Sequence, residues 1–539
     1  MNKTSFNTNS LFLKFSKAIK EKKNLEAKNI LEKILSINPN IFEANHNLAI
    51  LSLQIGDIDN SILYFEKSKK LNPRFSQVYF NLALAYDKKG DVDQALINFK
   101  KVVELDSNNS LALYNIGHLY IKKMNIDNAE NYLQKSLELN PNFILAYHEL
   151  FSLYDRSNQL EKYKDLLNKL KKLLNDKRIV NFYFAFYEYR KKNYKATIEL
   201  LKDLDLEEKY FHQIITKHGI LAKSYDKIKK FDEAYYHYQT NNDLVNKYYG
   251  KDIKEKNFIK YVNNRIDFFK NFNLKNWSVS KERSEFHDPI FLIGFPRSGT
   301  TLLDTILRTN KSVEVIEEKP ILKNFLINLE KKTNNDLGQL GNLDQEYIQR
   351  MQNFYFDERK KYQQNKNSKI VIDKMPLNII HIGEILRFFP NAKFVFALRN
   401  PYDCVLSCFM QQFQLNPAMK NFLSINSSAI LYNLVMQLWT IYRKVFSINC
   451  HFVKYEETVL NFEKTTKDIY KFLNIIWSDE TKNFYKTGKD RIDISTPSYD
   501  QVTSPLYSKS INRWKNYEKE FEGVKNLLDR WANEFNYKI

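Results

Sequence analysis

The sequence predicts a two-part protein, an all-α repeat solenoid followed by an α/β domain with a doubly wound parallel sheet. In the first half, small, bulky and turn residues recur every 34 residues. In the second half, short apolar strands alternate with helical patterns, and a strand, a glycine-containing loop and a helix follow one another from Asp288. With 539 residues, 43% of them hydrophobic, the chain can form several cores.

Each repeat of the first half is expected to be a pair of antiparallel helices. Pro39, Pro73, Ser107 and Pro141 fall 34 residues apart. This period and pattern are similar to the tetratricopeptide repeat, whose units stack into an array. The expected core columns are the small residues Ala27, Ser61, Ala95 and Ala129, the bulky residues Leu31, Phe65, Phe99 and Leu133, and the first-helix residues Leu48, Leu82, Ile116 and Leu150, with Gly56, Gly90 and Met124 at the turns.

Such an array is expected to bind a protein or peptide on its concave face. Asn47, Asn81 and Asn115 recur at the same step and are candidates to clamp an extended peptide backbone; the alternative is that they are solvated or pack between helices. The period blurs beyond about residue 160, but two degenerate units follow. We therefore expect a repeat array over 8–250, a linker over 251–287 and an α/β domain over 288–539.

The α/β domain contains four apolar segments that we expect to be parallel strands. They are separated by helical patterns, as in sheets with helices on both faces. Ligands of such sheets bind beyond the carboxyl ends of the strands. The expected strands are 290–294, 368–372, 393–398 and 450–453.

The first strand leads into a loop that is typical of phosphate binding. Gly294 and Gly299 have the spacing of a nucleotide-triphosphatase loop, but Thr300 stands where that loop has its lysine. The missing lysine removes the charge that clamps a terminal phosphate beside magnesium. Backbone N–H groups and a helix N-terminus remain, which suits a single 5′-phosphate. Additional donors are expected from Arg297, Ser298, Thr300 and Thr301.

Two further segments carry charged residues at expected strand ends. Arg399 ends the strand 393–398, and Ser407 follows in the next helix, so this pair could bind a second phosphate. Lys374 lies at another strand end, where Pro376 prevents helix formation. It could stabilise bridging and leaving oxygens.

The segment 296–301 resembles the 5′-phosphosulfate loop of sulfotransferases that use 3′-phosphoadenosine 5′-phosphosulfate (PAPS). The similar branch comprises tyrosylprotein sulfotransferases and bacterial sulfotransferases with tetratricopeptide repeats. The resemblance covers about residues 285–520 and implies a sulfotransferase fold, PAPS as donor and no metal. It also implies that Arg297, Ser298, Gly299, Thr300 and Thr301 bind one phosphate end of PAPS, and that Arg399 with Ser407 binds the other.

The same resemblance assigns the catalytic groups. Glu318 stands at the family spacing after Arg297 and would accept the proton of an acceptor hydroxyl; the neighbouring Glu317 is an alternative base. Lys374 and Ser498 would neutralise charge on the departing phosphate. The tail also offers Ser504, Lys509 or Arg513 as a phosphate contact, and Arg513 could instead form a structural salt bridge.

Charge and cysteine content bear on the binding partners and the cellular compartment of the protein. Lysine and arginine exceed aspartate and glutamate by 83 − 63 = 20, yet no recognisable nucleic-acid-binding module is present, so nucleic acid is not an expected partner. Three cysteines are too few for a disulfide framework. No long uncharged apolar run occurs. We therefore expect a soluble, cytoplasmic protein without a transmembrane segment.

Two other functions compete with sulfuryl transfer to an acceptor hydroxyl. One is a P-loop kinase or triphosphatase, which the absent loop lysine disfavours. The other is a repeat scaffold whose second half binds nucleotide without catalysis. The sequence leaves open the acceptor, which could be a protein tyrosine, a glycan or a small molecule, and also the oligomeric state.

Overall fold

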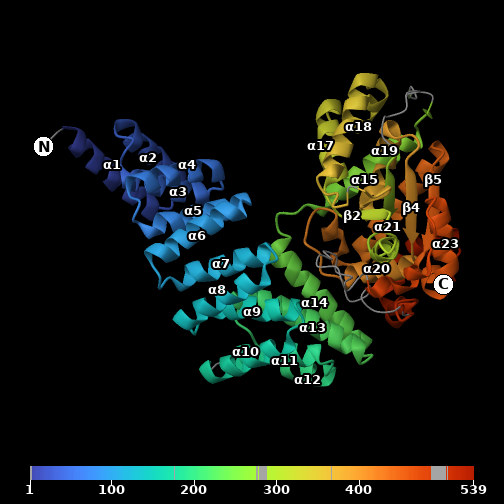
Figure 1. The fold of residues 1–539 in the computed structure, drawn as a ribbon, viewed down its shortest axis with the longest axis horizontal. Coiled ribbons are helices and arrows are strands. Elements are labelled where there is room, and N and C mark those ends of the chain that lie inside the picture. Colours follow the sequence, from blue (N-terminus) through green and yellow to red (C-terminus); the bar gives the residue numbers. More distant parts are fainter. Residues whose placement is uncertain are drawn as a thin grey trace. The chain divides into compact units, whose positions relative to one another are not determined.

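A computed structural model shows a chain divided into two compact units, 1–206 and 207–539 (Figure 1). Each unit has its own hydrophobic clusters. The structure describes residues 3–174, 177–274, 277, 288–365, 367–486, 506 and 508–538.

The first unit consists of consecutive helix pairs. Contacts are most numerous within the pairs α3–α4, α5–α6 and α7–α8, as stacked two-helix repeats require. The helices are α1 (Lys3–Lys20), α2 (Asn24–Ile37), α3 (Phe42–Gln54), α4 (Ile58–Leu71), α5 (Ser76–Lys89), α6 (Val92–Leu105), α7 (Ser110–Lys122), α8 (Ile126–Leu139), α9 (Ile144–Arg156), α10 (Leu160–Leu173), α11 (Lys177–Arg190) and α12 (Tyr194–Leu201).

The repeated columns of the sequence form the core of this unit. All small and bulky residues predicted for it are buried, from Ala27 to Leu150. Gly56 and Gly90 have φ of 84° and 86° at their turns, the left-handed region that glycine enters most easily. Met124 occupies the same turn position with φ 57°. The turn therefore has the same left-handed conformation in the repeat that carries methionine at this position.

The predicted asparagine column lies on the first helices of successive repeats. Asn47 donates to the carbonyl oxygen of Glu43 at 2.9 Å, and Asn115 to that of Leu111 at 2.7 Å. Asn81 accepts from Gln77 at 3.1 Å. These contacts fix the side chains along their own helices. Asn81 also lines a hollow of about 410 Å³ between α3 and α5.

The second unit contains a five-stranded, wholly parallel sheet. Its strand order is β2-β3-β1-β4-β5. Because all strands run the same way, their carboxyl ends share one edge, and β1 lies at the centre where the strand order reverses. The strands are β1 (Ile290–Gly294), β2 (Val313–Glu317), β3 (Ile370–Lys374), β4 (Lys393–Leu398) and β5 (Asn449–Lys454).

The sequence did not predict β2. Its five residues, Val-Glu-Val-Ile-Glu, include two glutamates and therefore do not form an uninterrupted apolar run. The strand pairs with β3 from Val313 to Glu317, and all five of its residues are buried. An edge strand this short is stabilised mainly by its neighbour, which the local pattern does not reveal.

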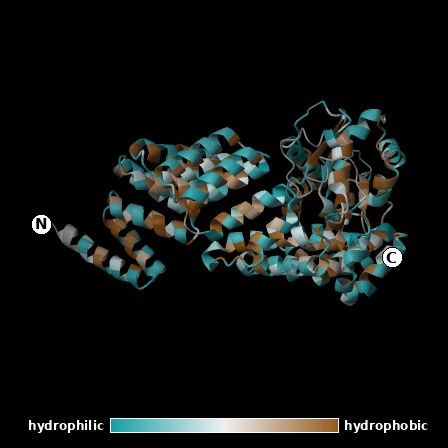
Figure 2. Ribbon diagram, turned by 90° about the horizontal axis from the view of Figure 1, so that it is seen from below, coloured by the Kyte–Doolittle hydropathy of each residue, from teal (hydrophilic) through white to brown (hydrophobic). Residues whose placement is uncertain are grey.

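Alternating side chains of the strands enter two separate cores, so the sheet is covered on both faces. Phe291 and Ile293 of β1 belong to one hydrophobic cluster, and Leu292 belongs to the other. The strands accordingly appear mostly hydrophobic in Figure 2. One face is covered by helices that include α15, α17, α18, α19 and α21, and the other by helices that include α16 and α23. This arrangement is the predicted doubly wound sheet.

The other elements of this unit are mainly helices. Within the described part of the chain, no helix is long and apolar enough to cross a membrane. The helices are η1 (Glu208–Tyr210), α13 (Phe211–Lys227), α14 (Phe231–Tyr249), α15 (Glu255–Lys270), α16 (Thr300–Leu307), α17 (Ile321–Thr333), η3 (Leu337–Asn342), α18 (Gln345–Lys360), η4 (Pro376–His381), α19 (Ile382–Phe388), α20 (Pro401–Phe409), η5 (Met419–Leu423), α21 (Ile425–Val445), α22 (Tyr455–Leu460), α23 (Phe462–Phe472), η6 (Asp479–Asn483), η7 (Arg513–Val524) and α26 (Lys525–Glu534).

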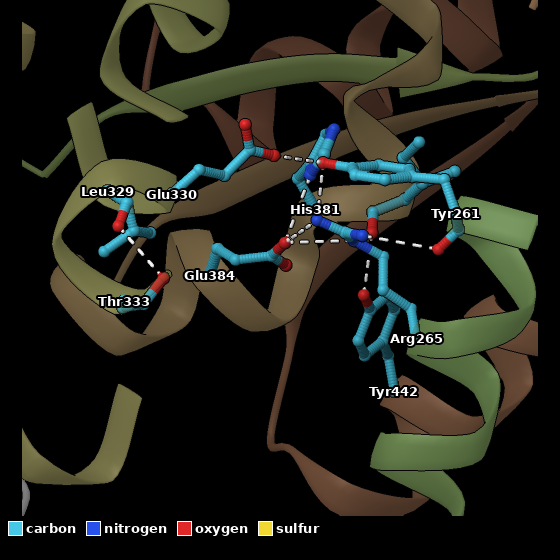
Figure 3. A network of polar contacts seen from close by, with 9 residues as sticks. Tyr261, Arg265, Leu329, Glu330, Thr333, His381, Glu384 and Tyr442 are labelled. Carbon is cyan, nitrogen blue, oxygen red and sulfur yellow. Dashed lines mark hydrogen bonds and ion pairs between the residues drawn. The ribbon is translucent and has the colours of Figure 1, made fainter. Parts of the chain in front are cut away.

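The division between the units differs from the predicted one at residue 250. The hairpin α13–α14, expected as a degenerate repeat, belongs to the second unit, where Asn242 donates to the carbonyl oxygen of Phe409 at 3.0 Å. Within the predicted linker 251–287, the segment Glu255–Lys270 is the packed helix α15, while 275, 276 and 278–287 lie outside the described residues. Its Arg265 forms a buried ion pair with Glu384 at 2.6 Å (Figure 3). These long-range contacts have no signature in local periodicity.

Candidate active site

The loop between β1 and α16 forms a concave turn at the carboxyl edge of the sheet. Gly299 is the N-cap of α16, with φ 103°, and Arg297 has φ 69°. Left-handed residues within such turns allow successive backbone N–H groups to line an anion-binding hollow, next to the positive end of the helix dipole. Gly294 has no space for a side chain, since a Cβ there would lie 2.6 Å from the carbonyl oxygen of Ala397.

The structure brings the two predicted phosphate-binding elements into direct contact. Arg297 Nε donates to Ser407 Oγ at 3.1 Å. Arg399 Nη1 donates to the carbonyl oxygen of Arg297 at 3.2 Å, across 102 positions of sequence. These residues follow β1 and β4, which are hydrogen-bonded neighbours. Adjacent parallel strands thus place both arginines at one edge.

Arg399 is held in a buried, charged setting. Burial alone would lower the pKa of its guanidinium, but the nearby Asp403 and other acidic groups raise it above its usual value. Among the described residues, neither Arg399 Nε nor Ser298 Oγ has a hydrogen-bond partner, although both atoms are buried. Buried donors without partners are costly, and a phosphate oxygen would satisfy them. The donor set therefore fits an anionic ligand.

Lys374 lies at the end of β3 between two consecutive glutamates. Its Nζ is 2.9 Å from Glu317 Oε1, 3.0 Å from Glu318 Oε1 and 3.4 Å from Thr301 Oγ1. Burial alone would lower the lysine pKa, but the carboxylates of Glu318, Asp304 and Glu317 raise it above its usual value. Lys374 is therefore a fully buried, charged ammonium beside the first turn of α16.

The two glutamates differ in exposure and backbone conformation. The Glu317 side chain, at the end of β2, is 5% exposed, whereas that of Glu318 is 35% exposed. Glu318 has φ 50°, and its N–H donates to the carbonyl oxygen of Lys374 at 2.8 Å. Left-handed non-glycine residues are strained and cluster at functional sites. Glu318 alone of the pair is open to an incoming group.

The C-terminal tail reaches the Arg399 side of the site. Arg399 Nη2 donates to the carbonyl oxygen of Ser510 at 2.7 Å. Asp403 accepts hydrogen bonds from the backbone N–H groups of Asn512 and Trp514 at 2.7 and 2.9 Å. Arg513 instead forms an ion pair with Asp226 at 2.9 Å, the structural alternative for this residue. Lys509 is exposed, while Ser498 and Ser504 lie outside the described residues.

Tyr455 borders the candidate site and was not predicted from the sequence. It follows β5, and its ring centroid lies 4.9 Å from the Arg399 guanidinium. A Cβ added at Gly299 would be 3.0 Å from Tyr455 Cδ2, so the ring also borders the loop. The next residue, Glu456, accepts from the N–H of Asn400 at 2.9 Å. The position of Tyr455 at the carboxyl end of an expected strand was the available signal.

Segments of both units match known families. Residues 289–479 match the sulfotransferase family. Residues 42–75, 76–109 and 110–143 match the tetratricopeptide repeat. The chain thus combines tetratricopeptide repeats with a sulfotransferase domain, as the resemblance implied. The matched segment includes both arginines, Lys374 and both glutamates of the site.

Several known proteins are similar to parts of the chain. An uncharacterized protein of Aquifex aeolicus is 26% identical over 343 residues, 59% of this chain and 43% of that protein. Protein-tyrosine sulfotransferase 1 of Danio rerio is 25% identical over 236 residues, 42% of this chain and 65% of the relative. Protein-tyrosine sulfotransferase 2 of Gallus gallus is 27% identical over 240 residues, which are 42% of this chain and 62% of the relative. The chain therefore spans less than two thirds of these relatives.

Solved structures resemble part of the chain as well. The crystal structure of MamA is 22% identical, with 32% of this chain and 94% of MamA covered and a TM-score of 0.30.

Proposed function

We propose that this protein transfers a sulfuryl group from PAPS to an acceptor hydroxyl. The observation that carries the proposal is the convergence of Arg297, Arg399 and Ser407, with Lys374 and Glu318 on neighbouring strands of the same sheet edge. The sulfotransferase family match over this segment supports it.

The loop between β1 and α16, together with Arg399 and Ser407, would hold the two phosphate ends of PAPS, which supplies the sulfuryl group when bound. Loop N–H groups, Ser298 and Arg297 suit the 5′ end, and Arg399 with Ser407 suits the 3′-phosphate. The unsatisfied Arg399 Nε and Ser298 Oγ are donors ready for these anions. Tyr455 offers an aromatic face next to both elements.

Glu318 would accept the proton of the attacking hydroxyl, because its carboxylate is the more exposed of the pair. The buried Glu317 would position Lys374 and keep it charged. Lys374 could then stabilise negative charge that develops on the leaving phosphate. Ser498 is proposed to assist there, as the resemblance implies.

Variants of the two glutamates test this assignment. In Glu318→Gln, turnover of labelled sulfate from PAPS without added metal is expected to fall by roughly 10² to 10⁴, the usual contribution of a general base. Binding of 3′-phosphoadenosine 5′-phosphate (PAP), measured by calorimetry, should persist. Glu457→Gln, an exposed glutamate after β5, is the matched control and should leave turnover unchanged.

Glu317→Gln should act differently. Loss of this carboxylate lowers the pKa of Lys374, so the alkaline limb of the pH–rate profile should move to lower pH. Full turnover by Glu318→Gln would show that Glu318 is not the base. Sulfuryl transfer that cannot be detected with any hydroxyl acceptor, despite PAP binding, would favour the non-catalytic scaffold.

The acceptor and partner are proposed by analogy. Relatives of the second half are named protein-tyrosine sulfotransferases, so a tyrosine hydroxyl is the proposed acceptor. Arrays of tetratricopeptide repeats present grooves for peptides, so the first half is proposed to recruit a protein substrate or partner. The hollow lined by His46, Gln77, Asn81 and Lys88 is a candidate contact surface.

A further inference from the structure

The first helices of successive repeats carry a column of basic residues near their last turn. At the 34-residue step, on α5, α7, α9 and α11, the column consists of Lys88, Lys122, Arg156 and Arg190. Two of these cations pair with an aspartate of the preceding repeat, 35 positions earlier. Lys122 Nζ lies 2.7 Å from Asp87 Oδ1, and Arg190 Nε lies 3.0 Å from Asp155 Oδ1. The pairs form part of the contact between consecutive repeats.

Lys88 lacks this aspartate. The position 35 residues before it is Leu53, on α3. Within the described part of the chain, Lys88 Nζ forms no hydrogen bond or ion pair, whereas Nζ of the adjacent Lys89 lies 2.7 Å from Asp59 Oδ1. The leucine therefore leaves the exposed Lys88 ammonium available to an anion from outside the array.

Arg156 differs from Lys88 in its electrostatic surroundings. The position 35 residues before Arg156 is Ile121, so this cation also lacks the aspartate. The carboxylate of Glu149, however, lies close enough to Arg156 for an electrostatic interaction. Lys88 is the member of the column for which the described residues provide no such acid.

Lys88 and Leu53 line the same hollow between α3 and α5, the first helices of consecutive repeats (Figure 1). The volume of the hollow is about 410 Å³, within the roughly 300–1,000 Å³ typical of ligand sites. Its lining consists of His46, Ile50, Leu53, Gln54, Gln77, Asn81 and Lys88. This lining contains one lysine and neither aspartate nor glutamate, so it favours an anionic guest over a cationic one.

The uncharged polar groups of the hollow suit the same kind of guest. Gln77 Nε2 donates to Asn81 Oδ1 at 3.1 Å, a contact that uses the amide oxygen and leaves the NH2 group of Asn81 as a donor. Burial lowers the pKa of His46, so its imidazole is neutral at pH 7. Lys88 therefore supplies the charge of the lining, and a carboxylate can accept from both the ammonium and the amide.

We propose that this hollow binds a carboxylate of an extended peptide, with Lys88 as the ion-pair partner. The inference rests on the proposed recruitment of a protein by the repeats, and it names the chemical group that the protein presents. The guest carboxylate takes the place beside Lys88 that Asp87 has beside Lys122 one repeat further along. Because packed helices hold the lining, the site is formed before the peptide binds, which reduces the entropic cost of binding.

Neutralising Lys88 in the full-length protein tests the proposed pair. Fluorescence anisotropy with a dye-labelled, amidated peptide, Ala-Glu-Glu-Ala-Glu-Ala, should detect binding to the wild type and about tenfold weaker binding to Lys88→Gln, the effect of roughly one charge-assisted hydrogen bond. Lys89→Gln removes the same charge from the adjacent, paired lysine and is the matched control. An equal loss in both variants would reveal a general attraction to the net positive charge and would overturn the proposal.

Restoring the aspartate provides a second test that leaves Lys88 in place. Leu53 is only partly buried, so a polar side chain can be accommodated there. Leu53→Asp should pair with Lys88, as Asp87 does with Lys122, and should weaken peptide binding about as much as Lys88→Gln. Leu53→Asn has the same size without the charge and should bind more tightly than Leu53→Asp. Equal binding by these two variants contradicts the proposal.

The carboxylate could come from an acidic side chain or from a C-terminus, and two peptides distinguish them. The amidated peptide has only side-chain carboxylates, and its glutamine counterpart with a free C-terminus has only the terminal one. Binding that depends on Lys88 identifies the source, and absence of such binding for both peptides overturns the proposal, even if sulfuryl transfer is observed. Conversely, Lys88-dependent binding without any transfer from PAPS supports the site and contradicts the proposed reaction.

Discussion

Two arginines near the C-terminal tail have the same charge but different surroundings. Arg399 contacts the loop between β1 and α16 and has an unsatisfied Nε, whereas Arg513 is paired with Asp226. Arg399→Ala should weaken PAP binding by about 1.5–3 kcal/mol, the value of a charge-assisted hydrogen bond. Calorimetry measures this change. Arg513→Ala is the matched control, and a comparable loss of PAP affinity in that variant would contradict the assignment.

Asp373, beside Lys374 on β3, predicts a pH dependence of stability. It is fully buried, and burial raises its pKa to about 7, although a hydrogen bond from Tyr355 at 3.1 Å opposes the rise. The unfolded chain releases this proton near pH 3.8. Between these values the folded state binds more protons, so this residue makes the free energy of unfolding fall as pH rises from about 4 to about 7.

Asp373→Asn should remove that contribution, because an amide does not ionise. From pH 5 to pH 8, its free energy of unfolding should rise relative to wild type by about 1–3 kcal/mol, since each pKa unit corresponds to about 1.4 kcal/mol. Urea unfolding at the two pH values measures the effect. Parallel pH dependence in both proteins would show that Asp373 is ionised in the folded state at pH 5.

At the scale of elements, a buried polar network attaches α15 to η4 and α19 of the same unit (Figure 3). Arg265 Nε and Nη2 both donate to Glu384 Oε1, and His381 contacts the same oxygen at 3.2 Å. Burial alone would raise the pKa of Glu384, but Arg265 and His381 lower it to about 2. The carboxylate is therefore ionised in the folded state. Its contribution to the free energy of unfolding is lost as pH falls below about 4 towards 2.

Glu384→Ala should destabilise the protein by about 3–5 kcal/mol, because it leaves Arg265 buried without its carboxylate. Chemical denaturation measures this loss. The exposed pair of Glu463 and Lys467, 2.7 Å apart, provides the control, and Glu463→Ala should destabilise the protein far less, because exposed ion pairs contribute little. Equal costs would mean that water reaches the Arg265 pair.

At the scale of the whole molecule, the boundary at residue 206 can be tested with fragments. Fragment 207–539 retains α13–α15 and should unfold cooperatively and bind PAP. Fragment 288–539, the predicted domain, lacks the partner of Glu384 and exposes the surface covered by Phe269, which is fully buried. It should melt at lower temperature in circular dichroism. Equal stability of the two fragments would contradict the boundary.

Strong local patterns allowed much of this architecture to be predicted. The repeat columns and the limits of β1 and β4 follow from periodicity, and the left-handed turn at Gly299 before α16 follows from glycine spacing. β3 begins two residues later than expected, at Ile370, and β2 was not predicted. The proximity of Arg297 to Ser407 and the burial of Glu317 depend on strand pairing, which a local pattern does not specify.

The sequence by itself determined the two kinds of architecture, since helical repeats and alternating strands have periods that appear in the order of residues. It also supplied candidate site residues, because few residue types bind phosphate at strand ends, and their roles remain a proposal. Only the tertiary structure decided that α13–α15 belong with the sheet, that Glu317 is buried while Glu318 is open, and that Tyr455 joins the site. The reason is physical: a side chain's partner depends on elements brought together by folding, often more than a hundred positions away.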